Sequence, residues 1–329
     1  MEARQLSSAE DRRWLDAAAR LAGRGRPLSR PNPAIGAILV AGGKVVGRGW
    51  TREGGRPHAE AVALEHAGEA ARGATLYVSL EPCAHHSARG PACADLAAAA
   101  GLGRVVVGCA DPDPRTAGMG MARIRQSGTP VDLVVSEACE ESLAGYLTRA
   151  RLGRPHVTLK LALSIDGCIA LANGQSQWLT GETARAHVHA ERARADAILV
   201  GGGTLRSDRP RLDVRLGGLE NRSPARWVLT GGEAPEGWQA LARPEAIGSM
   251  EGVQYLFVEG GAATAAAFLR ADLVDRLLVY RAPVIIGGGL AGVGDIGLTE
   301  LEPTHGRWGM VDRRALGKDR LEVYQRSRS

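Results

Sequence analysis

The sequence predicts an α/β protein made of two domains. Strand-like and helix-like patterns alternate along both halves of the chain, which argues for sheets covered by helices. The alternation breaks once, around Gly153 and Pro155, before a new strand begins at His156. The chain has 329 residues, which is enough for a sizeable core in each half. We therefore expect one domain over residues 1–150 and a second over residues 151–329.

In the first half, short apolar runs between breaks predict strands, and longer runs with apolar residues three and four positions apart predict helices. The expected order is a helix over 9–21, strands over 34–40 and 44–49, a helix over 59–71, a strand over 75–79, a helix over 92–100, a strand over 104–109 and a helix over 137–149. His58 would then open a helix and Cys83 would follow a strand. Ligand sites commonly occupy such junctions.

The second half repeats the alternation. Its predicted elements are a strand over 156–162, a helix over 182–194, strands over 197–200, 226–230 and 254–259, a helix over 262–271 and a strand over 276–281. Residues 216–250 are rich in glycine, proline and charge, so we expect surface loops there. The sequence shows no internal repeat.

Composition indicates an ordinary soluble protein, because 44% of the residues are hydrophobic and 23% are charged. Five scattered cysteines do not form a disulfide framework, which favours a reducing compartment, and we assign no role to Cys109, Cys139 and Cys168. Residues 1–26 are charged throughout and lack the apolar stretch of a signal peptide. No apolar run approaches the roughly 18 residues of a membrane span. We expect a cytoplasmic protein.

The net charge of +5 favours anionic ligands, although an arginine-rich composition can produce it without any ligand. Nucleic acid is the less favoured partner, because the chain holds only 6 Trp, 5 Tyr and 2 Phe and no basic stripe interleaved with them. The short basic run at Arg149, Arg151 and Arg154 reads better as a solvated linker. Charge alone therefore leaves open whether the chain binds an anionic ligand.

The residues that indicate a reaction are His58, Glu60, Cys83 and Cys93. One histidine and two thiolates give zinc three protein ligands and leave the fourth position open for water, as in catalytic zinc sites. The metal lowers the pKa of that water to about 7. Glu60, two residues after His58 on a helix, can move protons without binding the metal. His-x-Glu followed by Pro-Cys-x-x-Cys is the zinc deaminase signature, so we expect hydrolytic deamination.

One feature departs from that signature, because nine residues instead of two separate Cys83 from Cys93. The second thiolate can therefore lie on a new helix, with a substrate-facing loop between the ligands. The alternative is a structural zinc site in which His85 or His86 is the fourth ligand and Glu60 is an ordinary helix residue.

Glycines follow predicted strands in the second half, at residues 201–203, 260–261 and 287–289. Gly260 and Gly261 directly precede a helix, whose free amides could meet a phosphate with no side chain in the way. Turn geometry alone also explains glycine at such positions, and the G-x-G-x-x-G dinucleotide fingerprint is absent. Both interpretations remain open on the residues alone.

Ordered motifs over nearly the whole chain resemble one family, the bifunctional riboflavin-biosynthesis deaminase/reductases. In the first half these are residues 31–36, 58–60, 80–86, 111–114 and 117–120; in the second they are 160–162, 164–167, 174–178, Thr204, Asp208, Pro210, Leu212, Arg215 and 258–261. The resemblance implies a cytidine-deaminase-like three-layer domain followed by a dihydrofolate-reductase-like α/β domain. It further implies a homo-oligomer, a dimer through the reductase domain.

The resemblance also implies two successive reactions on one phosphorylated diaminopyrimidine. In the first, zinc on His58, Cys83 and Cys93 supports hydrolytic deamination at C2, Glu60 relays protons and Asn32 orients the substrate. In the second, NADPH reduces the ribosyl group to ribityl. The implied NADPH contacts are Ala162, Trp178, Thr204, Asp208, Gly261, Ala262, Ala263, Thr264, Ala265, Ala266 and Ala267. The implied substrate contacts are Ser176, Arg192, Leu212, Arg215 and Glu259, to which we add Lys160 as a cation near the reacting sugar.

An arginine can hold a phosphate monoester with two parallel hydrogen bonds, which suits Arg192 and Arg215 to this substrate. Without the resemblance, surface arginines, a buried Trp178 and a turn residue at Asp208 would be the ordinary interpretations.

The chain also departs from the family pattern. The loop over residues 84–92 is one residue longer, Thr230 stands where an aspartate is common, and the segments after Arg215 and Gly289 are shortened.

Two competing functions are consistent with the motifs. One is a deaminase of free nucleosides or nucleic-acid bases, with the second half as a specificity module. The other is a non-catalytic, zinc-stabilised nucleotide-binding or regulatory protein, against which stands Glu60, because a structural zinc site needs no free carboxylate.

Overall fold

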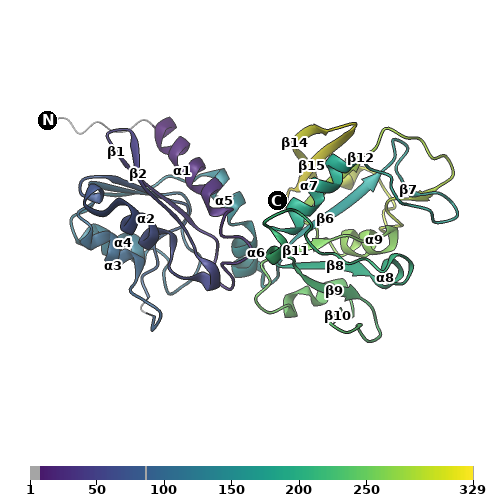
Figure 1. The fold of residues 1–329 in the computed structure, drawn as a ribbon, viewed down its shortest axis with the longest axis horizontal. Coiled ribbons are helices and arrows are strands. Elements are labelled where there is room, and N and C mark those ends of the chain that lie inside the picture. Colours follow the sequence, from purple (N-terminus) through teal and green to yellow (C-terminus); the bar gives the residue numbers. More distant parts are fainter. Residues whose placement is uncertain (1–7, 86, 329) are drawn as a thin grey trace. The chain divides into compact units, whose positions relative to one another are not determined.

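The computed structural model describes residues 8–85 and 87–328, and the chain divides into two compact units, Met1–Gly153 and Arg154–Ser329. Each unit is an α/β body with its own sheet and its own core (Figure 1). Within the described residues, no helix has the length and apolar character needed to cross a membrane.

Among the described residues, the first unit forms a five-stranded sheet in the order β2-β1-β3-β4-β5. The strands are β1 (Gly36–Ala41), β2 (Lys44–Trp50), β3 (Thr75–Val78), β4 (Arg104–Val107) and β5 (Val131–Leu133). β1 is antiparallel to β2 and β3, whereas β3, β4 and β5 are parallel, with Val78 in register with Val107. The carboxyl ends of β3 and β4 therefore meet at the same edge, and the segments that follow stay together because the Glu81 amide donates to the Cys109 carbonyl at 2.9 Å.

Helices cover both faces of this sheet and make three layers. They are α1 (Ser8–Ala22), α2 (Ala59–Ala67), α3 (Cys93–Ala99), α4 (Met119–Gln126), α5 (Glu137–Ser142) and α6 (Ala144–Leu152). Two glycines show how closely the layers approach. A Cβ at Gly36 would lie 2.0 Å from the Ala18 carbonyl oxygen of α1, and a Cβ at Gly49, on the opposite face, would lie 2.2 Å from that of Ala59 in α2. Glycine lets backbones pack at this distance.

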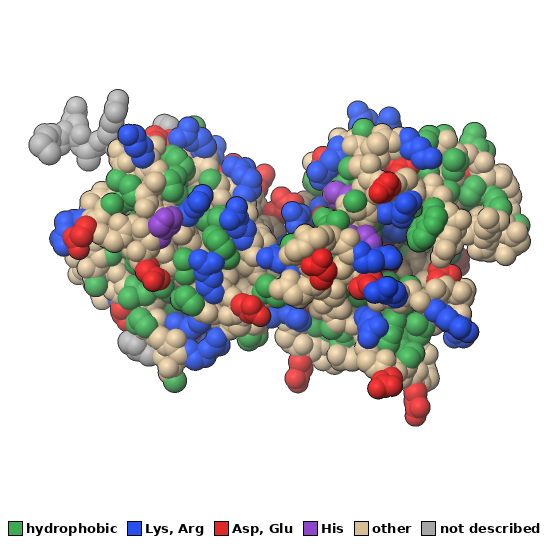
Figure 2. All heavy atoms as spheres, viewed as in Figure 1, with side chains coloured by type: hydrophobic (Ala, Val, Ile, Leu, Met, Phe, Trp, Pro, Cys, Tyr) green, Lys and Arg blue, Asp and Glu red, His purple; other side chains and the backbone are tan. Residues whose placement is uncertain are grey.

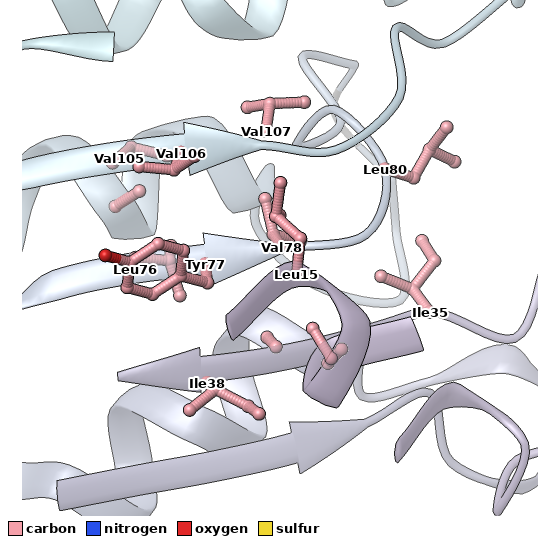
Figure 3. Packing of buried hydrophobic residues seen from close by; sticks show 14 of the residues in the cluster. Leu15, Ile35, Ile38, Leu76, Tyr77, Val78, Leu80, Val105, Val106 and Val107 are labelled. Atoms are coloured by element: carbon pink, nitrogen blue, oxygen red, sulfur yellow. The ribbon is translucent and has the colours of Figure 1, made fainter. Parts of the chain in front are cut away.

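The core of the first unit lies between β3, β4 and the helices (Figure 3). Leu76, Val78, Val105 and Val107 are fully buried, and α1 adds Leu15 to the same cluster. Tyr77 is also buried, and its hydroxyl donates to Asp11 at 3.0 Å. A buried hydroxyl needs such a partner, which fixes α1 against the sheet.

The second unit, over its described residues, has an eight-stranded sheet in the order β10-β9-β8-β11-β6-β12-β15-β14. The first six are parallel, and the last two join antiparallel. The strands are β6 (His156–Leu163), β8 (Ala197–Gly201), β9 (Ala225–Leu229), β10 (Gln239–Leu241), β11 (Tyr255–Val258), β12 (Arg276–Arg281), β14 (Trp308–Leu316) and β15 (Asp319–Arg326). A separate pair joins β7 (Cys168–Ala170) to β13 (Leu290–Ala291).

Its helices are α7 (Glu182–Arg192), α8 (Gly202–Asp208) and α9 (Ala262–Arg270). Phe268 of α9 packs with one buried cluster and Val188 of α7 with another, so the two helices cover opposite faces of the sheet. Alternate residues of β11 supply both clusters, since Val258 belongs to the first and Phe257 to the second. Short 3₁₀ turns are η1 (Glu53–Gly55), η2 (Gly68–Ala71), η3 (Glu220–Arg222), η4 (Pro244–Ser249) and η5 (Glu302–Thr304).

The α/β prediction is confirmed, and most predicted elements are present within one or two residues. Two helix predictions are wrong in detail. The helix expected over 59–71 ends at Ala67, because Gly68 leaves helical geometry with φ 54°, and the helix expected over 137–149 is two helices that meet at Leu143. The β14–β15 hairpin is an unpredicted element, since β14 is mostly exposed and carries no apolar run.

Charge is dispersed on the surface. On the face drawn in Figure 2, lysine and arginine side chains are interspersed with acidic and hydrophobic ones on each unit. That face carries no continuous basic stripe of the kind that follows a nucleic-acid backbone.

Candidate active sites

Three strand and helix ends bring the metal-binding residues together. His58 is the N-cap of α2, Cys83 lies in the segment after β3, and Cys93 is the first residue of α3. The Cys93 amide donates to the Cys83 sulfur at 3.3 Å, and the Ala94 amide donates to the Cys83 carbonyl at 3.1 Å. These bonds close the intervening loop, so both thiols reach one point although nine residues separate them.

The side-chain geometry fits zinc. His58 Nδ1 lies 3.2 Å from Cys93 Sγ and 3.6 Å from Cys83 Sγ, and the three ligand atoms lie within 4.8 Å of one another. Tetrahedral zinc, with Zn–S near 2.3 Å and Zn–N near 2.0 Å, would place such atoms about 3.5 Å apart. Hydrogen bonding from the Cys93 thiol, reinforced by His58, lowers the pKa of Cys83. A thiolate is the form that binds metal.

The fourth ligand of a structural site is missing from this group. Among the described residues, the candidate ligands are His58, Cys83 and Cys93, and His85 is not one of them. His86, the other residue of that alternative, lies outside the described residues. Three ligands leave a position for water, as a hydrolytic centre requires.

Glu60 lies beside the ligands in the first turn of α2 and is only 1% exposed. Neither of its oxygens has a hydrogen-bond partner within residues 8–85 and 87–328. Burial raises the pKa of Glu60, although the nearby His58 acts in the opposite direction. A buried carboxylate without a partner is unfavourable for stability, which indicates a role in binding or proton transfer.

Asn32 connects the metal group to the neighbouring turn. Its Nδ2 donates to the Gly55 carbonyl at 2.9 Å and lies 3.1 Å from His58 Nε2, the ring nitrogen that faces away from the thiols. Groups at this second nitrogen orient a metal-binding imidazole. Asn32 therefore contacts a ligand directly, in addition to the substrate role that the sequence implied.

A cavity of about 160 Å³ opens onto His58, Glu60 and Cys83. It is also lined by His85, the alternative fourth ligand, and by residues to which the sequence analysis assigned no role in binding or catalysis: Glu81, Asp111, Asp113, Arg115 and Tyr146. Tyr146 of α6 donates to Asp111 Oδ1 at 2.6 Å, and burial raises the pKa of Asp111. Asp111 follows the carboxyl end of β4, a position that strand-end reasoning could have found. Tyr146 carries no comparable signal.

Glu81 holds the loop that supplies these residues. It is 1% exposed and accepts hydrogen bonds from the amides of Asp111, Gly118, Gly120 and Met121 at 3.4, 3.0, 3.0 and 3.1 Å. A carboxylate with several backbone donors is well satisfied in a buried position. Glu81 is thus a structural carboxylate, and Glu60 is the unpartnered one.

In the second unit, three charged residues predicted to contact substrate come together. Arg192, at the end of α7, binds Glu259, just after β11, through two hydrogen bonds of 2.6 and 3.0 Å. Lys160 Nζ on β6 lies 4.0 Å from the same carboxylate. Burial alone would raise the pKa of Glu259, but the positive charges of Arg192 and Lys160 lower it below its usual value. Burial also lowers the pKa of Lys160, because it disfavours the charged ammonium form.

Arg215 is connected to the cluster of Lys160, Arg192 and Glu259 by hydrogen bonds of neighbouring residues. Arg192 donates to the Asp213 carbonyl at 3.1 Å, and the Arg215 amide donates to His189 Nδ1 at 3.2 Å. Burial and the charges of Arg192 and Arg215 lower the pKa of His189, which favours the neutral ring that can accept this bond. Leu212 is buried, so its side chain belongs to the core of the unit.

The glycine-containing turns after β8 and β11 leave backbone amides accessible to a nucleotide. Gly261 is the N-cap of α9, and a Cβ there would lie 3.7 Å from Thr204 Oγ1, so the turns after β8 and β11 adjoin. At Gly203 a Cβ would meet nothing within 4 Å. Open amides beside a hydroxyl fit the phosphates of a dinucleotide. Within the predicted run, the side chains of Thr264, Ala265 and Ala266 are buried and Ala262, Ala263 and Ala267 are more exposed.

The remaining predicted contacts are dispersed. Ala162 lies on β6, and Asp208 ends α8 on the surface. Ser176 and Trp178 lie in an exposed loop, where the Arg185 guanidinium stacks 4.9 Å from the Trp178 ring. In the part of the chain that the structure describes, no hydrogen bond joins this loop to Lys160, Arg192 or Glu259.

Comparison with known proteins covers nearly the whole chain. Residues 8–109 match the cytidine and deoxycytidylate deaminase zinc-binding region, and residues 155–239 and 245–318 match the RibD C-terminal domain. The riboflavin biosynthesis protein RibD of Escherichia coli is 38% identical over 334 residues, covering 86% of this chain and 90% of that protein. That of Aquifex aeolicus is 37% identical, covering 89% and 92%.

Solved structures agree in fold. Acinetobacter baumannii RibD superposes with a TM-score of 0.85 at 30% identity, over 98% of this chain and 100% of that one. A diaminohydroxyphosphoribosylaminopyrimidine deaminase/5-amino-6-(5-phosphoribosylamino)uracil reductase from Thermotoga maritima gives 0.85 at 29% identity, over 97% and 99%.

Proposed function

This chain belongs to the RibD family of bifunctional riboflavin biosynthesis enzymes, and on that premise we propose how its own residues carry out the two reactions. The enzyme is a zinc-dependent deaminase joined to an NADPH-dependent reductase. Its substrate is 2,5-diamino-6-ribosylamino-4(3H)-pyrimidinone 5′-phosphate, and its product is 5-amino-6-ribitylaminouracil 5′-phosphate. We assign deamination to residues 1–150 and reduction to residues 151–329.

His58, Cys83 and Cys93 would hold the zinc, which would supply an activated water molecule at neutral pH. Glu60 accepts a proton from the water whose oxygen adds to C2 of the pyrimidine. It then delivers a proton to the amino nitrogen, the C2–N bond breaks, and ammonia leaves. The raised pKa of Glu60 suits both steps, because a group that exchanges protons works best near the operating pH.

The cavity residues orient the ring for this reaction. Asn32 lines the cavity beside His58, and its Oδ1 is available to an N–H group of the pyrimidine. Asp111 accepts hydrogen bonds from the Tyr146 hydroxyl and from the Asp113 amide on the same oxygen, Oδ1. Its second oxygen is thus available to another donor of this amino-rich substrate.

The single observation that carries the deaminase assignment is the buried, unpartnered Glu60 beside three zinc-type ligands. The experiment that tests it is ammonia release by Glu60→Gln, in which zinc must remain bound while turnover is lost. A nucleoside or nucleic-acid deaminase would instead release ammonia from cytidine or adenosine, with no NADPH binding.

The second unit would hold NADPH, which would supply a hydride for the reduction of C1′ of the ring-opened sugar. We assign its binding to Ala162, Trp178, Thr204, Asp208 and residues 261–267. Ser176, Arg192, Leu212, Arg215, Glu259 and Lys160 are assigned to the substrate. Arg215 is 56% exposed at its side chain and can turn its guanidinium to the phosphate.

The charged cluster supports this assignment. Glu259 holds the Arg192 guanidinium and attracts Lys160, which places two cations and one anion around a single point. Lys160, whose pKa is lowered by burial, is suited to donate a proton to the ring oxygen of the sugar as the C1′–O4′ bond breaks and the ring opens. Its test is Lys160→Met, which should slow NADPH oxidation on deaminated substrate without affecting ammonia release.

We also propose that the enzyme is a cytoplasmic homodimer formed through its reductase domain. Its five cysteines are free and buried, as expected of a reducing compartment. On the edge strand β14, Met310 and Val311 are 55% and 52% exposed, which suits strand-edge association. Light scattering tests the proposal, since a monomeric mass at working concentrations contradicts it.

A further inference from the structure

The last turn of α7 holds the backbone of residues 213–215 at two points. His189 and Arg192 lie three positions apart on this helix, so their side chains project from the same face. Arg192 Nη1 donates to the Asp213 carbonyl at 3.1 Å, and His189 Nδ1 accepts from the Arg215 amide at 3.2 Å. The segment carries Arg215, the arginine assigned above to the substrate phosphate, so α7 fixes the position from which that side chain extends.

Packing and a third hydrogen bond fix the segment further. Leu212 and Val214 are 4% and 3% exposed, and Leu212 belongs to the cluster that also contains Val188, the residue before His189. The Val214 amide donates to Ser223 Oγ at 3.0 Å. Leu212 has a φ of 56°, in the left-handed region that a leucine rarely adopts. Such a conformation persists only where the surrounding contacts enforce it, and it occurs most often at binding and active sites.

The Arg215 side chain is less constrained than its backbone. An amide nitrogen only donates, so His189 Nδ1 must carry the lone pair and Nε2 the hydrogen. Nε2 therefore does not accept from Arg215 Nη2, which lies 3.4 Å away. The Asp213 carboxylate lies 3.5 Å from Arg215 Nε but 2.7 Å from Arg211 Nη2, so Arg211 is its closer partner. The Arg215 side chain is 56% exposed and its guanidinium remains available to an anion.

We propose that His189 is a positioning residue of the reductase, which holds the backbone of Arg215 so that its guanidinium meets the substrate phosphate. The inference rests on the proposed function of the second unit, and it names a residue that acts through Arg215 without touching the substrate. Because a guanidinium binds phosphate best through two parallel hydrogen bonds, a small displacement of the Arg215 backbone weakens that contact. His189 thus contributes to the selection of a phosphorylated substrate.

The test compares full-length wild type with His189→Leu and His189→Asn on the deaminated substrate with and without its phosphate. Leucine favours the helix but removes the acceptor, so kcat/KM for the phosphorylated form should decrease about tenfold, through KM. Asparagine offers Oδ1 in place of Nδ1 and should restore the preference for phosphate. The form without phosphate should react equally in all three proteins. The proposal is overturned by an equal loss on both forms, by no loss, or by a loss in His189→Asn as large as in His189→Leu.

His187→Leu is the matched control on the same helix. His187 Nδ1 lies 2.7 Å from the hydroxyl of the buried Tyr280, so this variant should lower the melting temperature and leave the preference for phosphate unchanged. Loss of that preference in His187→Leu would mean that any disturbance of α7 is sufficient, and would reject the positioning role.

A double variant tests whether His189 acts through Arg215. If it does, His189→Leu combined with Arg215→Met should resemble Arg215→Met alone, because the arginine that His189 positions is already gone. Additive losses in kcat/KM for the phosphorylated form would show that His189 acts on the substrate by another route, and would contradict the proposal.

A binding measurement separates this inference from the proposed function. The ribityl product and the same molecule without its phosphate can be titrated by calorimetry without NADPH, so no turnover is needed. Wild type should bind the phosphorylated form more tightly, and His189→Leu should reduce that difference about tenfold. Because both proteins have the same first unit, the change reports on the second. If NADPH is never oxidised but this change is seen, the reductase assignment fails and the positioning role stands. If NADPH is oxidised and the change is absent, the positioning role fails.

Discussion

Replacing Glu60 with glutamine should abolish deamination while leaving the zinc site and the reductase intact. The substitution keeps the size of the side chain and removes its charge and its ability to exchange protons. Because Glu60 is 1% exposed and its oxygens lack partners in the described chain, the variant loses no hydrogen bond that the structure shows. An amide also avoids the unfavourable burial of a charge. We therefore expect the melting temperature without metal to be unchanged or higher.

The size of the effect follows from the role assigned to the carboxylate. A positioned general acid–base contributes about 10²–10⁴-fold to a rate. Since each tenfold corresponds to about 1.36 kcal/mol, the barrier should rise by roughly 3–5 kcal/mol. Solvent water has little access to replace the carboxylate in this buried position, so the loss should approach the upper end of that range.

The assay measures ammonia release by a coupled dehydrogenase, with zinc content determined on the same preparation. Glu65→Gln, an exposed change on the same helix, is the matched control and should resemble wild type. Reduction of the already deaminated substrate should proceed at the wild-type rate in both variants. The reasoning is refuted if Glu60→Gln keeps more than a tenth of the ammonia release, or if it loses zinc.

Further outcomes test the two sites separately. Chelation of zinc should stop ammonia release, leave NADPH oxidation on deaminated substrate unchanged, and be reversed by added zinc; parallel loss of both activities would contradict separate sites. Tyr146→Phe removes the 2.6 Å bond to Asp111 and should lower kcat/KM for ammonia release about tenfold, a prediction that unchanged kinetics would reject. Arg192→Met leaves Glu259 without its main partner and should reduce unfolding free energy by roughly 3–5 kcal/mol in denaturant titrations, besides slowing reduction. Because the folded pKa of Glu259 lies below its ordinary value of 4.5, its stabilising contribution is complete above that pH and declines as the pH falls further. Thermal unfolding between pH 7 and 3 should therefore be less acid-sensitive in Glu259→Gln, and identical pH profiles would count against the ion pair.

The zinc site could be predicted from sequence because its chemistry is encoded locally. His58 and Glu60 are two residues apart, and each thiol lies beside a strand or helix end that apolar runs reveal. Folding adds only the meeting of those ends, where the Cys93 and Ala94 amides donate to Cys83 and His58 Nδ1 lies beside both thiols.

Other parts of the sites depend on contacts between distant segments. Tyr146 reaches Asp111 across 35 positions, and Arg192 meets Glu259 across 67, so neither pair has a pattern in the sequence. The break at Leu143 lies two residues before Gly145, but a single glycine inside a helical pattern does not by itself end a helix, which is why one helix was expected there.

The most direct test of the central claim, that one chain carries out both reactions in sequence, is a two-stage assay on the phosphoribosyl diaminopyrimidine. Ammonia is followed first without coenzyme, and the loss of NADPH absorbance is followed after NADPH is added. The account predicts ammonia release, and then NADPH oxidation in an amount that matches the ammonia formed. Ammonia without subsequent NADPH oxidation would contradict the reductase assignment, and the absence of both signals from zinc-loaded enzyme would contradict the account as a whole.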